Sequence, residues 1–145
     1  MTNMPGNKVI VDSDALIGLL NETDQLHKRC IAISSFLNEN NLQTIVPYAI
    51  VLEAATALAR DKTIKRPDLA HKLLQDYISI EDKPNYESNV SDLVAKLYNP
   101  GTSKKNTPFD HFVLAIAKKN NIAYVFSFDS FYKKNGLNLA EELIK

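Results

Sequence analysis

Residues 8–20 read KVIVDSDALIGLL, and this stretch decides the class of fold. Lys8 to Asp12 is a short run rich in β-branched apolar residues, which predicts a buried strand. Ser13 and Asp14 are residue types that cap helices, capping is the favoured role of Ser13, and the apolar residues after them open a helix. A strand that leads directly into a helix is the first unit of an α/β fold.

Strands and helices alternate along the rest of the chain. A second helix is predicted to begin at Thr23 or Asp24, so two helices separate the first two strands. Strands are expected at 8–12, 44–46, 78–80, 123–126 and 137–139, and helices at 15–20, 24–37, 47–61, 69–77, 90–97 and 107–120. This order predicts a three-layer α/β/α fold with a central parallel sheet of four or five strands.

Length and composition favour a single domain. The chain has 145 residues, of which 45% are apolar, so we expect one domain over 1–145, with 1–7 flexible. Cys30 is the only cysteine, which excludes an internal disulfide and suits a reducing compartment. The apolar tract 45–59 is shorter than the roughly 20 residues of a membrane span, and the N-terminus does not resemble a signal peptide. These features predict a cytoplasmic protein with no membrane partner.

The charge balance argues against one class of function. There are 17 basic and 17 acidic residues, whereas proteins that coat nucleic acid usually carry a basic excess. An acidic, metal-filled site with basic side chains around it remains compatible with zero net charge. The pairs Lys104-Lys105 and Lys133-Lys134 could steer phosphates to such a site, or could be ordinary solvated surface. The three histidines are scattered, which argues against a Cys/His metal site, and we interpret them and Cys30 as structural.

Four acidic residues are placed where such a site would form. Asp12 ends the first predicted strand, and Asp129 follows the strand at 123–126. Asp110 lies in the first turn of a predicted helix, and Glu53 lies about 9 Å along the helix that begins at Pro47. In parallel α/β folds, strand ends and helix beginnings meet at the carboxyl edge of the sheet. The four carboxylates are therefore predicted to converge there.

A cluster of carboxylates needs a counter-ion. Like charges raise one another's pKa values, and an unpaired buried charge is costly. Ligation by oxygen atoms alone suits Mg²⁺ or Mn²⁺ better than Zn²⁺. The chemistry that follows is hydrolysis of a phosphodiester by a metal-activated water.

Simpler structural roles stay open for these residues. Asp110 could close a capping box with Thr107, and Asp129 could form an Asx turn. Glu53 is harder to explain in this way, because residues 49–55 are otherwise apolar, as in a buried helix. A lone carboxylate in such a helix calls for a partner.

Four segments together resemble the motifs of PIN domains. Each segment contains one of the four acidic residues in a matching context of strand or helix. The segments are VIVDSDAL at 9–16, IVPYAIVLE at 45–53, TPFDHFVLAIA at 107–117 and YVFSFDSF at 124–131. The resemblance extends from Lys8 to about Leu139, and its specificity comes from the order and spacing of the four motifs.

The resemblance implies a metal-dependent endoribonuclease. Asp12, Glu53, Asp110 and Asp129 would bind Mg²⁺ or Mn²⁺, with Ser127 assisting, and the role of Asp14 is unsettled. The size is similar to the toxin ribonucleases of VapBC-type toxin–antitoxin pairs. That family implies an RNA substrate, a homodimer and an antitoxin protein that occludes the site.

Two other functions stay open. Asp12-Ser13-Asp14 also looks like the nucleophile motif of haloacid-dehalogenase-type phosphatases, although the later Gly-Asp-x-x-x-Asp motif of that family is missing. A catalytically inactive PIN scaffold that binds RNA or protein would usually have lost an acidic position, and all four are present. The sequence gives neither the RNA target nor the identity of an antitoxin, and it does not separate a toxin from a housekeeping nuclease.

Overall fold

Four parallel strands, in the order β2-β1-β3-β4, form the centre of the protein. They are seen in a computed structural model that describes residues 7–81, 83, 85–101 and 105–144. The strands are β1 (Lys8–Val11), β2 (Gln43–Ile45), β3 (Tyr124–Phe126) and β4 (Asn138–Leu139). Ile10 of β1 pairs with Ile45 on one side and Val125 on the other. The predicted parallel sheet is confirmed, with four strands.

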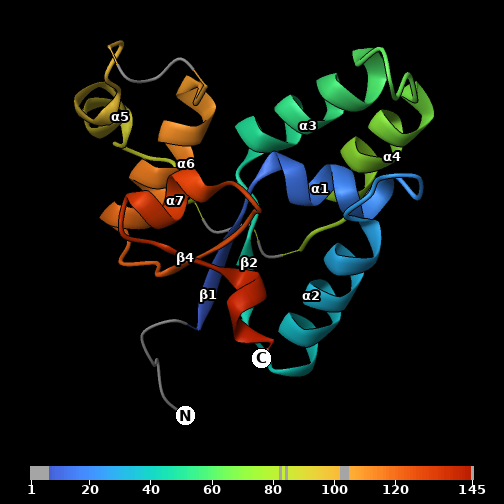
Figure 1. The fold of residues 1–145 in the computed structure, drawn as a ribbon, viewed down its shortest axis with the longest axis horizontal. Coiled ribbons are helices and arrows are strands. Elements are labelled where there is room, and N and C mark those ends of the chain that lie inside the picture. Colours follow the sequence, from blue (N-terminus) through green and yellow to red (C-terminus); the bar gives the residue numbers. More distant parts are fainter. Residues whose placement is uncertain (1–6, 82, 84, 102–104, 145) are drawn as a thin grey trace.

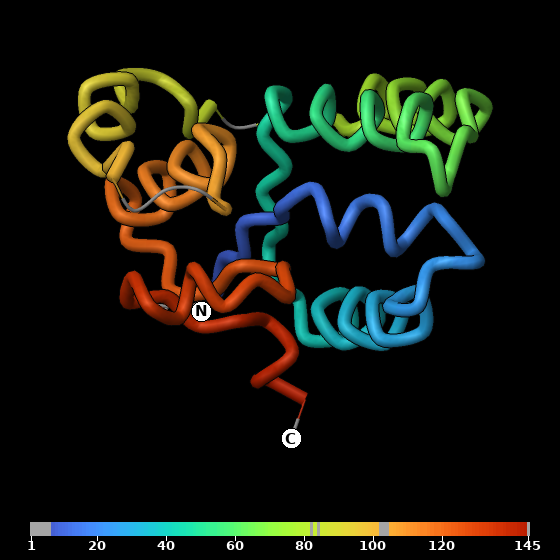
Figure 2. Tube along the Cα trace, turned by 45° about the horizontal axis from the view of Figure 1, so that its top comes forward, coloured from blue at the N-terminus to red at the C-terminus, as the bar shows by residue number. Residues whose placement is uncertain are grey.

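Helices cover both faces of this sheet, which confirms the predicted three layers (Figure 1). In both Figure 1 and Figure 2, α1 and α2 lie on one side of the sheet and α5, α6 and α7 on the other. Helix α3 packs against α4 and α1. The helices are α1 (Ser13–Leu20), α2 (His27–Glu39), α3 (Tyr48–Arg60), α4 (Pro67–Ile78), α5 (Ser91–Leu97), α6 (Pro108–Lys119), α7 (Ser130–Lys134) and the 3₁₀ helix η1 (Ala140–Leu143).

Strand β1 lies at the centre of the core because it pairs with β2 on one side and β3 on the other. Val9, Ile10 and Val11 are buried although they alternate in direction, because helices cover both faces of the strand. Val125 and Phe126 of β3 are buried beside them. This explains why these strands are continuous apolar runs rather than alternating ones.

The strand predicted at 78–80 is wrong. Ile78 is the last residue of α4, and Ser79 caps the carboxyl end of that helix. The Ser79 hydroxyl and backbone N–H both donate to the carbonyl of Asp76, and the Ile80 N–H donates to the carbonyl of Tyr77. These bonds close a final turn, so the helical pattern prevails over the β-branched residues.

Two predicted helix starts also need correction. Helix α2 begins at His27, not at Thr23 or Asp24, because the carboxylate of Asp24 accepts a bond from the Leu26 N–H and holds this segment in a turn. The N-cap of α1 is Asp12, one residue before the expected Ser13.

The prediction for residues 1–7 is only partly within the described structure. Residues 1–6 lie outside it, and the carbonyl of Asn7 accepts a bond from the Gln43 N–H, which extends the pairing of β1 with β2. Within the described part of the chain, no helix is both long and apolar enough to cross a membrane.

Gly18 controls how closely α1 approaches α2. A Cβ at this position would lie 2.5 Å from the Sγ of buried Cys30. Gly18→Ala is therefore expected to destabilise the protein by about 1–3 kcal/mol, a cost typical of overpacking, although alanine alone favours a helix. Urea unfolding measures this cost. The double variant Gly18→Ala/Cys30→Ala should recover part of it, and a double variant less stable than either single variant would contradict the packing argument.

Candidate active site

Asp12 lies at the carboxyl end of β1 and is almost fully buried, with 3% of its surface exposed. Its Oδ1 accepts a bond from the Ser13 N–H at 2.8 Å, and its Oδ2 accepts a 2.6 Å bond from the Tyr132 hydroxyl. Burial is the main cause that raises the pKa of the Asp12 carboxyl from 3.8 to about 7, and the charge of Asp14 adds to it. Asp12 is thus a buried acid whose charged form is disfavoured without a counter-ion.

Asp14 joins α1 to the turn between β3 and α7. Its Oδ2 accepts bonds from the Ser127 hydroxyl at 3.0 Å and the Phe128 N–H at 2.8 Å, and its Oδ1 accepts one from the Ala15 N–H at 2.9 Å. Burial raises the pKa of this carboxyl, and the three hydrogen bonds oppose that rise. The geometry gives Asp14 a positioning role, because it holds the segment that carries Asp129.

Ser127 and Asp129 are fixed within the same turn. The Ser127 hydroxyl oxygen accepts a bond from the Asp129 N–H at 3.1 Å, and the serine is buried. Asp129 caps α7 through its Oδ1, which accepts a bond from the Phe131 N–H at 2.9 Å. This is the bond expected of an Asx turn, so Asp129 has a structural role whatever else it does.

Asp110 is linked to Asp129 by Asn106. The predicted capping box is present, since Asp110 accepts from the Thr107 N–H at 3.0 Å and Thr107 in turn caps α6. The side-chain amide of Asn106 donates to the Oδ2 of Asp110 at 3.2 Å and to the Oδ2 of Asp129 at 3.0 Å. One neutral amide therefore connects two of the predicted metal ligands.

Glu53 on α3 contributes the fourth carboxylate. Its Oε1 is buried and has no hydrogen-bond partner among the described residues. Burial raises the pKa of the Glu53 carboxyl, the charges of Asp110 and Asp14 raise it further, and the Ser13 hydroxyl lowers it. The charge of Glu53 thus interacts with those of acids from α6 and α1, and its service in a site stays a prediction.

The acids are electrostatic neighbours but do not form an assembled metal site. No group of three or more Asp, Glu, His or Cys residues in the described ranges is arranged to hold a metal ion. The carboxylates of Asp12, Asp110 and Asp129 each accept a hydrogen bond from a protein donor, namely the Tyr132 hydroxyl, the Thr107 N–H and the Phe131 N–H. The donor set nevertheless fits Mg²⁺ or Mn²⁺, because every candidate ligand is a carboxylate oxygen and Oε1 of Glu53 lacks a partner.

Sequence reasoning missed two residues of this region, Asn106 and Tyr132. Tyr132 is completely buried and donates to Asp12 from 120 positions away. Neither residue carries a sequence signal, since an asparagine in a polar loop and a tyrosine in a short helix are common. His111 hydrogen-bonds to the Thr107 carbonyl at 2.8 Å and packs against the rings of Tyr98 and Phe131.

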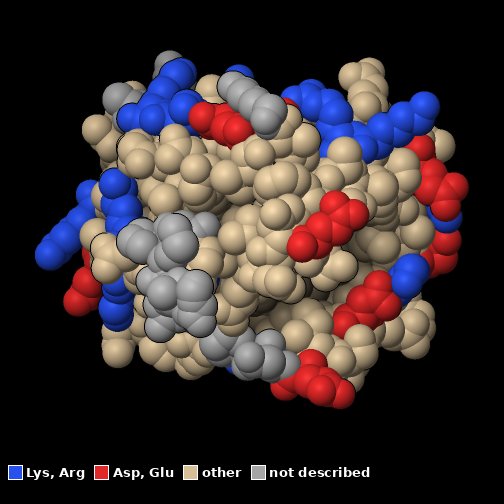
Figure 3. All heavy atoms as spheres, turned by 90° about the horizontal axis from the view of Figure 1, so that it is seen from below, with Lys and Arg blue, Asp and Glu red and all other residues tan. Residues whose placement is uncertain are grey.

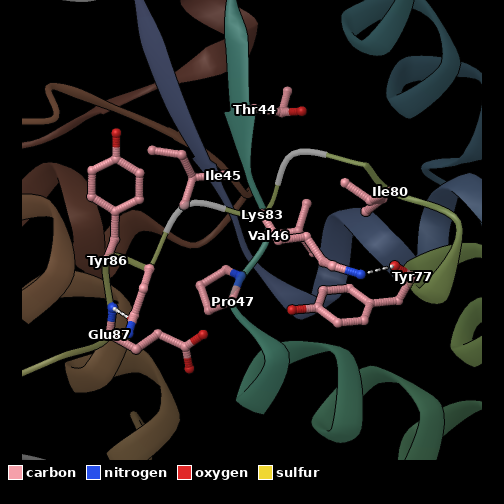
Figure 4. Close-up of a pocket in the computed structure, with 10 residues that line it drawn as sticks. Thr44, Ile45, Val46, Pro47, Tyr77, Ile80, Lys83, Tyr86 and Glu87 are labelled. Carbon is pink, nitrogen blue, oxygen red and sulfur yellow. Dashed lines mark hydrogen bonds between the residues drawn. The ribbon is translucent and has the colours of Figure 1, made fainter.

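A cavity of about 400 Å³ beside β2 contains none of these acids (Figure 4). Pro47 and Tyr77 line it, and the Lys83 ammonium lies over the Tyr77 ring, 5.0 Å from its centroid. Among the described residues that line it, Glu87 is the one acid, and its carboxylate accepts a bond from the Tyr48 N–H at 3.2 Å. The described lining of this cavity therefore contains no set of groups that could do chemistry on a phosphodiester.

The described residues at the opposite, amino edge of the sheet form no continuous basic surface. Because β1 runs upward in Figure 1, Figure 3 shows this edge from below. Among the described residues, Lys and Arg lie mainly around the rim of this face, interspersed with Asp and Glu, and uncharged residues fill most of its centre. The carboxyl edge is thus the better candidate for function.

The parallel sheet in the order β2-β1-β3-β4, with helices on both faces, defines a PIN-domain fold. The crystal structure of VapC20 from Mycobacterium tuberculosis, a sarcin–ricin loop cleaving toxin, is similar, with a TM-score of 0.74 and 14% sequence identity. The match covers 89% of this chain and 95% of that one. No protein-family model and no curated protein sequence matches the chain. At this level of identity, the comparison shows the fold.

Proposed function

We propose that this protein is an endoribonuclease that depends on Mg²⁺ or Mn²⁺ and acts in the cytoplasm as the toxin of a toxin–antitoxin pair. One observation carries the proposal most strongly: Glu53 has a buried, unpartnered oxygen beside acids that raise the pKa of its carboxyl. A divalent cation bound by these carboxylates would relieve both their mutual repulsion and the missing partner.

In the proposed mechanism, Asp12, Glu53, Asp110 and Asp129 hold the cation. When bound, the cation would lower the pKa of water and stabilise negative charge on the phosphate oxygens. Tyr132 fixes one oxygen of Asp12, and Asp14 with Ser127 fixes the turn that carries Asp129. These residues orient the ligands, which is the usual work of hydrogen bonds around a metal site.

The proposed partners follow from the fold and from the similar structure. VapC20 is described as a toxin that cleaves the sarcin–ricin loop. For this chain we propose RNA in a single-stranded or loop conformation as the substrate, a homodimer as the assembly, and an antitoxin protein that occludes the carboxyl edge.

Cleavage of a labelled RNA hairpin that contains a sarcin–ricin loop tests the activity. We expect cleavage in Mg²⁺ or Mn²⁺, none in EDTA, and recovery when Mn²⁺ is added in excess of EDTA. The matched control is Asp68→Asn, which removes an exposed acid in the first turn of α4 that is paired with Arg66 and with none of the candidate ligands. It should cleave like the wild type.

The same assay separates the nuclease from a binding scaffold. A scaffold would bind the hairpin and leave it intact under every metal condition. Cleavage that is undiminished in EDTA would count against metal dependence, and intact RNA in Mn²⁺, over a panel of loop sequences, would count against the nuclease itself.

A further inference from the structure

A second cavity adjoins the candidate active site on the side of α5 and α7. It measures about 310 Å³, and its lining includes Lys105, Asn106, Asp129, Phe131 and Lys134. Asn106 and Asp129 belong to both places, since the Asn106 amide bonds to the carboxylates of Asp110 and Asp129. A ligand in the cavity would therefore lie directly beside the proposed reaction centre.

The cavity places positive charge beside the acidic edge, since Lys105 and Lys134 line it. Lys105 and Lys134 have no ion-pair partner within the described part of the chain. By contrast, Lys133, the neighbour of Lys134 in sequence, is paired with Glu142 at 3.0 Å and does not line the cavity. Of the pair Lys133-Lys134, the first lysine thus forms an ion pair within the fold and the second lines the cavity. Lys104 lies outside the described residues.

From this geometry we infer that the cavity is a subsite for the RNA strand, where Lys105 and Lys134 bind a phosphate next to the scissile one. The inference rests on the proposed ribonuclease function and names the residues that hold its substrate. A polyanion that approaches four carboxylates is repelled, and nearby unpaired cations offset that repulsion. The amide of Asn106 and the ring of Phe131 add the polar and flat surfaces that suit a nucleotide.

Binding of a fluorescein-labelled RNA hairpin in EDTA, followed by anisotropy, tests the subsite without any cleavage. The variants are Lys105→Ala, Lys134→Ala and their combination, and Lys133→Ala is the matched control. We expect the double variant to bind at least tenfold more weakly than wild type, with each substitution lowering the slope of log Kd against log salt by about one. Lys133→Ala should bind within twofold of wild type.

Cleavage kinetics of the same variants in Mn²⁺ provide the second measurement. A phosphate subsite predicts that KM rises about tenfold in the double variant while kcat changes little. The reason is that the lost contact stabilises the bound substrate and the transition state equally. Competition with inorganic phosphate separates a strand subsite from a site for the free ion. Millimolar phosphate should displace the RNA only weakly, and strong displacement would overturn the assignment to a strand.

The two proposals can fail separately. If wild type cleaves RNA and the double variant matches Lys133→Ala in both Kd and KM, the subsite is wrong and the nuclease stands. A different result would keep the subsite and overturn the nuclease. In that result the wild type binds RNA without cleaving it, the double variant binds RNA more weakly, and Lys133→Ala binds like the wild type.

Discussion

The Asp12→Asn protein is expected to lose RNA cleavage by roughly 10³-fold, the size typical of removing one essential electrostatic group. In EDTA at pH 8 it should also be more stable than wild type. The raised pKa of Asp12, about 7 instead of 3.8, corresponds to roughly 4 kcal/mol against its charged form. Asparagine removes this charge. Its side-chain oxygen can still accept the hydrogen bond from the Ser13 N–H, and its NH₂ group would face the Tyr132 hydroxyl oxygen.

Asp68→Asn is the matched control for this pair of effects. Asp68 is an exposed acid bonded to Arg66, which lowers the pKa of its carboxyl to about 2, the opposite direction to Asp12. The control should cleave normally and gain no stability. Equal cleavage by Asp12→Asn and wild type would remove Asp12 from the site, and a loss of both activity and stability would mean that its role is only structural.

The metal-free wild type is expected to lose stability as the pH rises from about 4 to about 7. The folded state keeps a proton on Asp12 in this window, whereas the unfolded state has already lost it, so each step up in pH favours unfolding. The raised pKa values of Asp14 and Glu53 act in the same direction. With the roughly 4 kcal/mol of Asp12, the melting temperature should fall by about 10 °C.

Thermal melts in EDTA at pH 4, 5, 6, 7 and 8 measure this profile, and Asp12→Asn should flatten it. Saturating Mn²⁺ at pH 8 should restore the lost melting temperature, because ligand that binds only the folded state stabilises it. A melting temperature that stays level or rises from pH 5 to 8 in EDTA would contradict the assignment of Asp12 as a buried, uncompensated acid.

The placement of the acids was predictable from the sequence because it depends on topology. Asp12 and Asp129 follow strands, and Asp110 begins a helix, so a parallel sheet with crossover helices brings them to one edge without knowledge of side-chain contacts. Their service as metal ligands remains a prediction. In the structure, Asp12 and Asp129 also cap helices, and Asp110 closes a capping box with Thr107.

The hydrogen-bond partners of these acids could not be predicted. The bonds from Asn106 to Asp110 and Asp129, and from Tyr132 to Asp12, depend on side-chain positions that strand and helix patterns do not encode. The strand expected at 78–80 failed for a related reason: local β-propensity was outweighed by continuation of α4 and by the bonds of Ser79 that close it.

A crystal grown in Mn²⁺, with anomalous diffraction measured at the manganese edge, tests the central claim most directly. The account predicts a manganese peak at the carboxyl edge, bound by oxygens of Asp12, Glu53, Asp110 and Asp129, and no peak there in a Glu53→Gln crystal. A fully occupied manganese site elsewhere with this edge empty, in crystals of a protein that cleaves RNA, would contradict it.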